Sequence, residues 1–282
     1  MQIKSRNIPA ELRVLESLNG RMAFLPEVDR QLRNMRDGLA GECRLDLALE
    51  SVSDCVIQIS DFTLARNQLC QIDAVLVSAN GIYLLDAKNW SGRHTVGDKG
   101  FERLTNDPLD QLKRAEKLFC RMLEYERIPL QVLSRLVFVN PEMTLYGVQP
   151  EMPIVLPQQL PEFVSEIKRH AGVLTEWEMR VAQRILAKHS EDNPYRLKVD
   201  YTWETVGKGM LCTSCRRLLV EKSHKYMWCP VCQVVESKGA ALLRTKAEMD
   251  VLFPGCKPEV DRLYRFCGGM VSKRGIFKAT RN

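Results

Sequence analysis

A hairpin-forming segment at residues 72–88 constrains this chain more than any other feature of its sequence. It reads Ile-Asp-Ala-Val-Leu-Val-Ser-Ala-Asn-Gly-Ile-Tyr-Leu-Leu-Asp-Ala-Lys, so two apolar runs flank the dipeptide Asn80-Gly81. Asn-Gly favours a two-residue type I′ turn between antiparallel strands. Because both faces of such a hairpin are apolar, we expect it to be covered on both sides.

Three charged residues of this segment fall on one face of the expected hairpin. With Ala79 opposite Ile82, Asp73 lies opposite Lys88 at about 5 Å between Cβ atoms, and Asp86 is a diagonal neighbour at about 7 Å. Two carboxylates at that separation can share a divalent cation, and a lysine can reach a phosphate or polarise a water. The alternative is an ordinary ion pair at the end of a strand. Since buried charges need partners or metals, the pattern favours a functional site.

A further carboxylate comes from a helix expected at residues 38–49, with Asp37 as its N-cap. Glu42 lies on the apolar stripe of that helix, three residues after Leu39 and three before Leu45. A carboxylate that faces a core requires a positive partner. The alternative is that Glu42 sits at the edge of the stripe and reaches solvent.

Another helix is expected to open after Asn106, with Asp107 as its N-cap and Pro108 at its first position. Gln111 shares a face with Ala115 and Met122, so we expect it to point inward. On this pattern alone, an inward glutamine near a helix start is more often a structural hydrogen-bonding residue than a member of a site.

These segments together resemble the nuclease-related domain family of the restriction-endonuclease-like PD-(D/E)xK superfamily. The resemblance covers about residues 35–150, and its most specific part is Asp-Ala-Lys-Asn-Trp-Ser-Gly at residues 86–92. It implies an α/β fold with a mixed sheet flanked by helices. It also implies that Glu42, Asp73 and Asp86 bind Mg²⁺ or Mn²⁺, that Lys88 is the catalytic lysine and that Gln111 assists. Ile72 stands where the superfamily name has proline, and Asp86 stands where this family more often has glutamate.

Phosphodiester hydrolysis suits these residue types. It requires charge stabilisation at the phosphate, an activated water and a stabilised leaving oxygen, and carboxylate-bound magnesium can supply all three. The resemblance therefore implies a metal-dependent nuclease, with DNA favoured over RNA as its substrate. Two alternatives stay open, namely a DNA-binding or regulatory protein that no longer cleaves, and an RNA-processing enzyme.

Two CxxC pairs, thirteen residues apart, predict a zinc ribbon in the C-terminal part of the chain. Four thiolates at this spacing close a tetrahedral structural site with no open position for catalysis. The expected ligands are Cys212, Cys215, Cys229 and Cys232. Four other cysteines lie in apolar segments and are expected to be buried thiols of a reducing cytoplasm, namely Cys43, Cys55, Cys70 and Cys120.

Positive charge gathers in the same part of the chain. Residues 201–282 carry fifteen Lys and Arg against seven Asp and Glu, whereas residues 1–200 carry twenty-six against twenty-eight. A basic module beside a nearly neutral one predicts a nucleic-acid partner, although ordinary solubility is the alternative. The expected contacts are Arg216, Arg217, Lys222, Lys225, Lys273, Arg274, Lys278 and Arg281, with Tyr226 and Trp228 available for stacking.

The sequence thus predicts four parts: a helical lead-in at 1–34, the nuclease-related domain at 35–192, the zinc ribbon at 200–238 and a basic helical segment at 239–282. In the last part, Gly268-Gly269 ends one helix and Ser272 begins another, an order that resembles a helix-turn-helix. No apolar run approaches the length of a membrane span and no signal peptide is recognised, so we expect a cytoplasmic protein without a membrane partner.

Overall fold

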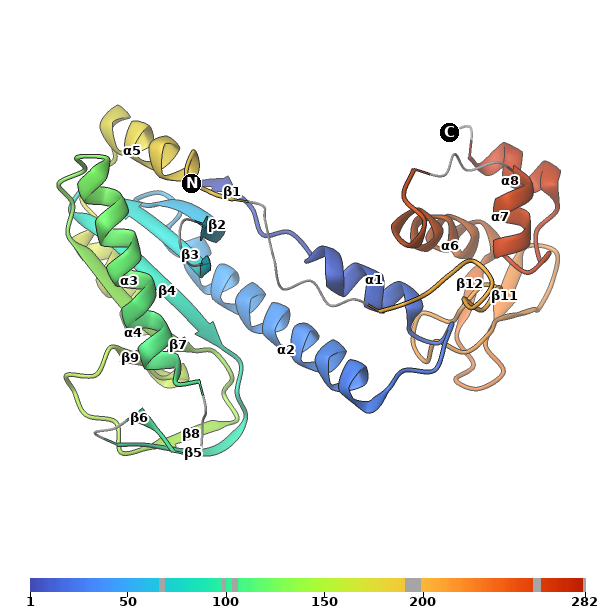
Figure 1. Ribbon diagram of the computed structural model, residues 1–282, viewed down its shortest axis with the longest axis horizontal. Coiled ribbons are helices and arrows are strands. Elements are labelled where there is room, and N and C mark those ends of the chain that lie inside the picture. The colour runs from blue at the N-terminus through green and yellow to red at the C-terminus, as the bar shows by residue number, and fades with distance from the viewer. Residues whose placement is uncertain (66–68, 98–99, 103–105, 191–198, 256–259, 281–282) are drawn as a thin grey trace. The chain divides into compact units, whose positions relative to one another are not determined.

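The computed structural model describes residues 1–65, 69–97, 100–102, 106–190, 199–255 and 260–280. The chain divides into two compact units, one made of residues 1–7 and 35–195 and the other of residues 8–34 and 196–282 (Figure 1). The lead-in expected at residues 1–34 is therefore shared between the two units. The linker expected near residues 191–194 lies outside the described residues, and the remaining domain boundaries stay predictions.

The first unit is built on a six-stranded sheet with the order β1-β2-β3-β4-β7-β9. Strands β2, β3 and β4 are antiparallel, whereas β1 joins β2, β7 joins β4 and β9 joins β7 in parallel. The sheet is therefore mixed, as expected. Its strands are β1 (Gln2–Lys4), β2 (Ile57–Ala65), β3 (Leu69–Ser78), β4 (Gly81–Lys88), β7 (Val132–Phe138) and β9 (Ile154–Val155).

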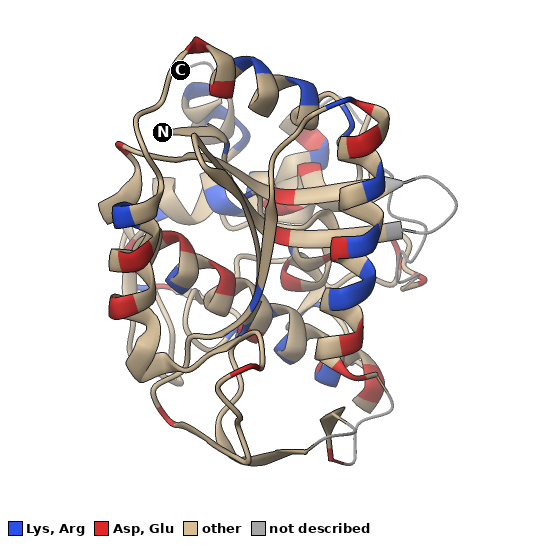
Figure 2. Cartoon of the chain, turned by 90° about the vertical axis from the view of Figure 1, so that its left-hand side faces the viewer, with Lys and Arg blue, Asp and Glu red and all other residues tan. Residues whose placement is uncertain are grey.

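Helices cover both faces of this sheet, so the α/β class predicted from the sequence is confirmed. On one face, α3 (Pro108–Tyr125) and α5 (Glu176–Leu186) contribute Phe119 and Ile185 to a core that includes Val75. On the other, the last turns of α2 (Pro26–Leu49) and α4 (Leu160–His170) pack around Leu76. Figure 2 shows charged residues spread along the helices while the strands are largely uncharged.

The first unit also contains a smaller, three-stranded sheet. Its strand order is β6-β5-β8, and its core packs Trp90 and Phe101 against Phe138 of β7, with ring centroids 5.4–5.9 Å apart. The strands are β5 (Gly92–Gly97), β6 (Gly100–Phe101) and β8 (Met143–Tyr146).

The register of the β3–β4 hairpin differs from the expected one. Ser78 pairs with Gly81, so the two-residue loop is Ala79-Asn80 and not Asn80-Gly81. The cause is tertiary, because both loop residues donate hydrogen bonds to carbonyl groups at the C-terminal end of α4, at 2.9 and 2.8 Å. Neither Asn80 nor Gly81 takes a positive φ, so the type I′ turn predicted by the dipeptide is wrong.

This register also changes the neighbours of the charged residues. Val75 faces Leu84 and not Asp86. The last pair of the ladder is Ala74 with Leu85, and the next pair in the same register is Asp73 with Asp86. The expected pairing of Asp73 with Lys88 is therefore wrong. The register is shifted by two residues, so the side chains that were expected to share a face of the sheet still share it.

The expected helix starts were right in one case and wrong in the other. Asp107 caps α3 by accepting a hydrogen bond from the Leu109 N–H at 2.7 Å, and Pro108 is the first helical residue. Helix α2, in contrast, begins at Pro26, so Asp37 lies inside it and is no N-cap. The helix predicted at residues 38–49 is the last half of a longer one.

The second unit combines helices with a three-stranded antiparallel sheet. Ser272 caps α8 through the Gly275 N–H, and Gly268 and Gly269 follow α7 with positive φ, as the sequence predicts. Whether α7 and α8 act as a helix-turn-helix stays a prediction. The elements are α1 (Ala10–Leu18), β10 (Val220–Glu221), β11 (Tyr226–Trp228), β12 (Val235–Ser237), α6 (Lys238–Leu252), α7 (Val260–Phe266) and α8 (Lys273–Ala279).

A buried arginine joins the N-terminal and C-terminal segments of this second unit. The side chain of Arg21 is fully buried and pairs with Glu248 of α6 at 2.5 Å. It also donates to the backbone carbonyls of Gly207 and Gly209 at 2.9 and 3.1 Å.

In the parts of the chain that are described, no helix has the length and apolar character needed to cross a bilayer.

Candidate active site and zinc site

The hairpin and the end of α2 bring four of the expected site residues together. On β4, Lys88 Nζ lies 2.6 Å from Asp86 Oδ1. The carboxylate of Asp73, on β3, accepts a hydrogen bond from the Ala87 N–H at 2.7 Å, which ties the two strands where their ladder ends. Asp73 interacts electrostatically with Asp86, Lys88 and Glu42, so the cluster includes residues from all three elements.

The acids of this cluster are held close in a poorly solvated place. Burial raises the pKa of Asp73 well above its usual range, and the neighbouring charges of Asp86 and Glu42 raise it further. The pKa of Glu42 is also raised, chiefly by burial, although Arg6 opposes the shift. Carboxylates crowded in this way favour an added positive charge, whether it is a proton, a basic side chain or a metal ion.

Lys88 keeps its proton firmly. Burial acts to lower its pKa, but Asp86 and Asp73 outweigh burial and raise the pKa above its ordinary value. The side chains of Lys88 and Asp86 remain 21% and 19% exposed, so a substrate can reach them. A protonated, accessible lysine is suited to neutralise a phosphate rather than to act as a free base.

A close approach between α2 and the chain after β4 fixes the position of Glu42. A Cβ on Gly41 would lie 2.6 Å from Cβ of Asn89. The Asn89 side chain donates to the Asp37 carbonyl at 2.8 Å and accepts from Arg44 at 2.7 Å. Glycine at position 41 therefore lets the helix lie against the segment that follows Lys88.

A basic residue that no sequence pattern pointed to, Arg6, lies beside this cluster. The side chain of Arg6 is only 5% exposed and pairs with Glu42 and Asp46, each at 2.8 Å, and with Asp61. It also donates to the backbone carbonyl of Asp73 at 2.8 Å. Residues 1–7 carry no periodic pattern that could have revealed Arg6, but Asp61 interrupts an apolar strand, and its φ of 51° marks a break in β2.

Gln111 does not point inward as expected. It is exposed on the first turn of α3, and Leu112, which is 3% exposed, faces the core instead. The expectation failed because Ala115 and Leu112 define the buried face, and Gln111 lies one position away from it. Its assisting role stays a prediction.

The acids do not form a closed set of ligands. Within the described ranges, only the four cysteines form a group of three or more His, Cys, Asp or Glu side chains whose ligand atoms all lie within 4.8 Å of one another. Glu42, Asp73 and Asp86 offer oxygen donors of the kind that magnesium prefers, and Asp73 and Asp86 have like charges in a poorly solvated place. The donor set therefore fits a divalent cation in its chemistry, with Glu42 already paired to Arg6.

The four cysteines of the second unit converge as their spacing predicts. The Sγ atoms of Cys212 and Cys232 lie 3.4 Å apart, as do those of Cys215 and Cys229. Backbone N–H groups lower the pKa of the Cys229 thiol to about 6, which favours the thiolate that binds metal. The cluster is consistent with a structural zinc site, next to the sheet β10-β11-β12.

The eight basic residues expected to contact nucleic acid fall into different environments. Arg216 is engaged inside the unit, because its guanidinium bonds to Glu248 and to the carbonyls of Asn19 and Glu16 at 2.8–3.0 Å. It is therefore a structural residue and not a free contact. Lys273 pairs with Asp261, and Arg281 lies outside the described residues. The other five of these eight residues are exposed, namely Arg217, Lys222, Lys225, Arg274 and Lys278.

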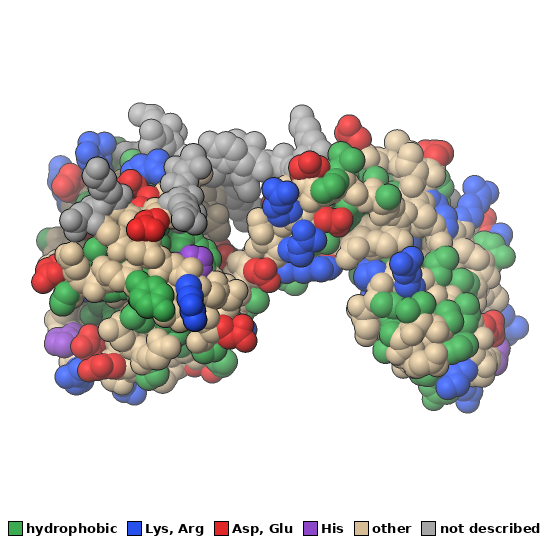
Figure 3. Space-filling view, turned by 90° about the horizontal axis from the view of Figure 1, so that it is seen from below, with side chains coloured by type: hydrophobic (Ala, Val, Ile, Leu, Met, Phe, Trp, Pro, Cys, Tyr) green, Lys and Arg blue, Asp and Glu red, His purple; other side chains and the backbone are tan. Residues whose placement is uncertain are grey.

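The ribbon sheet also exposes apolar side chains beside these bases (Figure 3). Val220 and Val235 flank Trp228 in register, and Tyr226 lies two residues from Trp228 on the same strand. Val220, Tyr226 and Val235 are 39–49% exposed. The four cysteines expected to be buried thiols differ from that expectation, because Cys43 is exposed and Cys55, Cys70 and Cys120 are only partly buried.

Comparison with known proteins identifies the region that contains the acidic cluster. No curated protein and no solved structure matches the chain. A family model described as the nuclease-related domain, NERD, matches residues 37–139, which run from α2 to the residue after β7. This range includes Glu42, Asp73, Asp86, Lys88 and Gln111, but neither Arg6 nor the cysteine cluster. The chain therefore carries a nuclease-related domain at residues 37–139, which implies a nuclease-related function for that region.

Proposed function

We propose that this protein is a metal-dependent nuclease that hydrolyses phosphodiester bonds, with DNA as its first candidate substrate. The observation that carries the proposal is the cluster of Asp73, Asp86 and Lys88 at the end of the hairpin, inside the nuclease-related domain. Two crowded carboxylates and a protonated lysine provide ligands for a cation and a positive charge for a phosphate.

In this proposal each residue has a distinct task. Asp73 and Asp86, with Glu42, would hold Mg²⁺ or Mn²⁺, which supplies Lewis-acid chemistry when bound. Lys88 donates hydrogen bonds to the substrate phosphate and neutralises charge as it develops. The Ala87 N–H donates to one oxygen of the Asp73 carboxylate, which restricts the rotation of that side chain. Gln111, exposed on α3, is left to contact substrate or solvent.

A cleavage assay on the full chain tests this function. Double-stranded DNA, single-stranded DNA and RNA are incubated with Mg²⁺, with Mn²⁺ or with chelator. We expect metal-dependent cleavage that Asp86→Asn and Lys88→Gln each reduce by about 100-fold or more. Matched controls are Glu124→Gln and Lys117→Gln, which change exposed charges on α3 and should leave the rate unchanged. Full activity of Lys88→Gln would remove the lysine from the mechanism.

The non-cleaving alternative has its own supporting observation. Arg6 already neutralises Glu42, and Lys88 already pairs with Asp86, so basic side chains partner two of the three acids. A protein that only binds DNA requires no cation at this place. If every substrate stays intact with either metal while the chain binds DNA, this alternative replaces the nuclease.

We also propose that the zinc-ribbon unit binds nucleic acid. Exposed Lys222 and Lys225 lie in the turn before β11, whose first residue is the exposed Tyr226, so phosphate contacts and base stacking are available together. Replacing both lysines by glutamine in the full chain should reduce the slope of log affinity against log salt by about 1.4–1.8. Lys246→Gln is the matched control, because that lysine pairs with Asp250 at 2.7 Å. An unchanged slope would mean that these lysines are merely solvated.

A further inference from the structure

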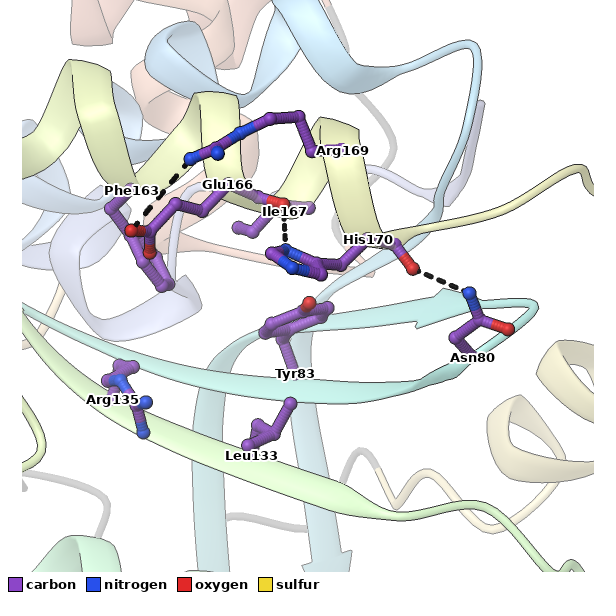
Figure 4. Close-up of a pocket in the computed structure, with 9 residues that line it drawn as sticks. All are labelled: Asn80, Tyr83, Leu133, Arg135, Phe163, Glu166, Ile167, Arg169 and His170. Carbon is purple, nitrogen blue, oxygen red and sulfur yellow. Dashed lines mark hydrogen bonds and ion pairs between the residues drawn. The ribbon is translucent and has the colours of Figure 1, made fainter.

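A cavity of about 480 Å³ lies between α4 and the strands β4 and β7 of the first unit. It shares no residue with the acidic cluster, although Tyr83 and Asp86 belong to the same strand. Figure 4 shows its side chains coming from two layers, with Tyr83, Leu133 and Arg135 on the sheet side and Phe163, Glu166 and His170 on the helix side. Its size falls within the usual range for pockets that hold small molecules.

One wall of this cavity is aromatic. The rings of Tyr83 and Phe163 meet edge to face, with centroids 6.5 Å apart and planes at 79°. Both residues are largely buried, at 9% and 8% exposure, so packing holds their rings in place. Because the two rings stand nearly at a right angle, they form with Leu133 an apolar corner that can contact one face and one edge of a planar ligand.

The rim of the cavity is positively charged. Arg135 of β7 and Arg169 of α4 face a single acid, Glu166, whose carboxylate is 4.0 Å from Arg169. Arg135 donates to the carbonyl of its own neighbour, Ser134, at 2.8 Å. Among the described residues no carboxylate lies within ion-pair distance of Arg135, so its charge is available to a ligand.

A polar group also reaches the cavity from its wall. The Tyr83 hydroxyl is directed toward the ring of His170 across the cavity, as Figure 4 shows. In the described part of the chain this hydroxyl has no hydrogen-bond partner. The positive charge of Arg135 acts on it, opposing the rise that burial gives to the pKa of Tyr83. Tyr83 and Arg135 both line this cavity, so one ligand can contact the hydroxyl and the guanidinium.

We infer that this cavity binds a nucleotide, with the base against Tyr83 and Phe163 and the phosphate at Arg135 and Arg169. A planar base matches the aromatic wall. Two guanidinium groups from different elements suit a phosphate better than a carboxylate, because a phosphate offers three oxygens and up to two charges. The inference does not depend on the proposed nuclease activity.

Calorimetric titration of the full chain tests this site, with adenosine monophosphate, adenosine and inorganic phosphate as probes. We expect saturable binding of the nucleotide and at least tenfold weaker binding of each of the other two. Arg135→Gln and Arg169→Gln should each weaken nucleotide binding about tenfold or more. Arg169 is exposed, so its variant keeps the test valid if Arg135→Gln fails to fold.

One matched control separates this cavity from other sites. Arg180→Gln removes an exposed arginine of α5 and should keep full affinity. Absence of saturable nucleotide binding would overturn the inference. Equal affinity for inorganic phosphate and nucleotide would exclude a role for the aromatic wall, and an equal loss in Arg180→Gln would exclude this location.

Discussion

Two glycines on one helix, Gly38 and Gly41, provide a sharp test of how Glu42 is positioned. A Cβ at Gly38 would meet no atom within 4 Å, whereas a Cβ at Gly41 would lie 2.6 Å from Cβ of Asn89. Alanine in a helix is favoured over glycine by about 1 kcal/mol, so Gly38→Ala should stabilise the first unit by up to that amount. At Gly41 the same gain is opposed by overpacking, which costs about 1–3 kcal/mol.

We therefore expect Gly41→Ala to be less stable than Gly38→Ala by about 1–3 kcal/mol. Local free energies from hydrogen exchange of α2 and β4 peptides measure this difference, with peptides of the second unit as an internal reference. Because α2 must move away from Asn89, Glu42 moves as well, and the proposed nuclease activity should fall in Gly41→Ala but not in Gly38→Ala. Equal stabilisation by both substitutions would refute the close approach as the factor that positions Glu42.

Three further predictions concern charge and metal. Arg6→Met leaves three carboxylates without their common partner and should destabilise the first unit by about 3–5 kcal/mol. The control Arg180→Met removes an exposed ion pair and should cost less than about 1 kcal/mol. Similar losses of stability for both variants, measured by hydrogen exchange, would contradict the buried pairing. With chelator present, the first unit should lose stability as the pH rises above about 4. The pKa of Asp73 is higher in the folded than in the unfolded protein, so the stability that its protonation provides is lost as the pH rises through the folded pKa. Asp73→Asn, which can still accept from the Ala87 N–H, should flatten this dependence in urea unfolding at pH 5 and pH 8, and parallel curves for both proteins would argue against the raised pKa. Cys229→Ser should contain one zinc per chain less than the unsubstituted protein in a colorimetric metal assay. Its hydrogen exchange should increase in β10, β11 and β12 but not in β2, β3 and β4. A metal content near zero in the unsubstituted protein would exclude the zinc site.

The parts of the fold that sequence predicted well are those that depend on local chemistry. Asp107 and Pro108 start α3 because an N-cap acceptor and a proline suit the first turn of any helix. Ser272 caps α8 for the same reason. The two CxxC pairs converge because each pair forms a tight turn of its own.

Two of the errors, the hairpin turn and the missed Arg6, arose where distant segments decide the outcome. The dipeptide Asn80-Gly81 favours one turn, but hydrogen bonds from Ala79 and Asn80 to the end of α4 select another. No local pattern could show that α4, ninety residues later, would supply those acceptors. The same holds for Arg6, whose partners lie 36 to 67 residues away along the chain.

The division of the lead-in changes how the two units can be separated in experiments. The second unit contains residues 8–34 as well as 196–282, and the buried pair Arg21–Glu248 and the bonds from Arg216 to Glu16 and Asn19 join these segments. A fragment that ends before the ribbon would keep α1 but lose its partners, exposing Leu15 and Leu18, which are at most 1% exposed in the whole chain. Such a fragment would confuse loss of nucleic-acid contacts with misfolding of α1. Charge-neutralising substitutions in the intact chain, at Lys222 and Lys225, avoid this because both side chains are exposed. The nucleic-acid affinity that we propose for the ribbon is therefore testable only while residues 8–34 keep their place in the second unit.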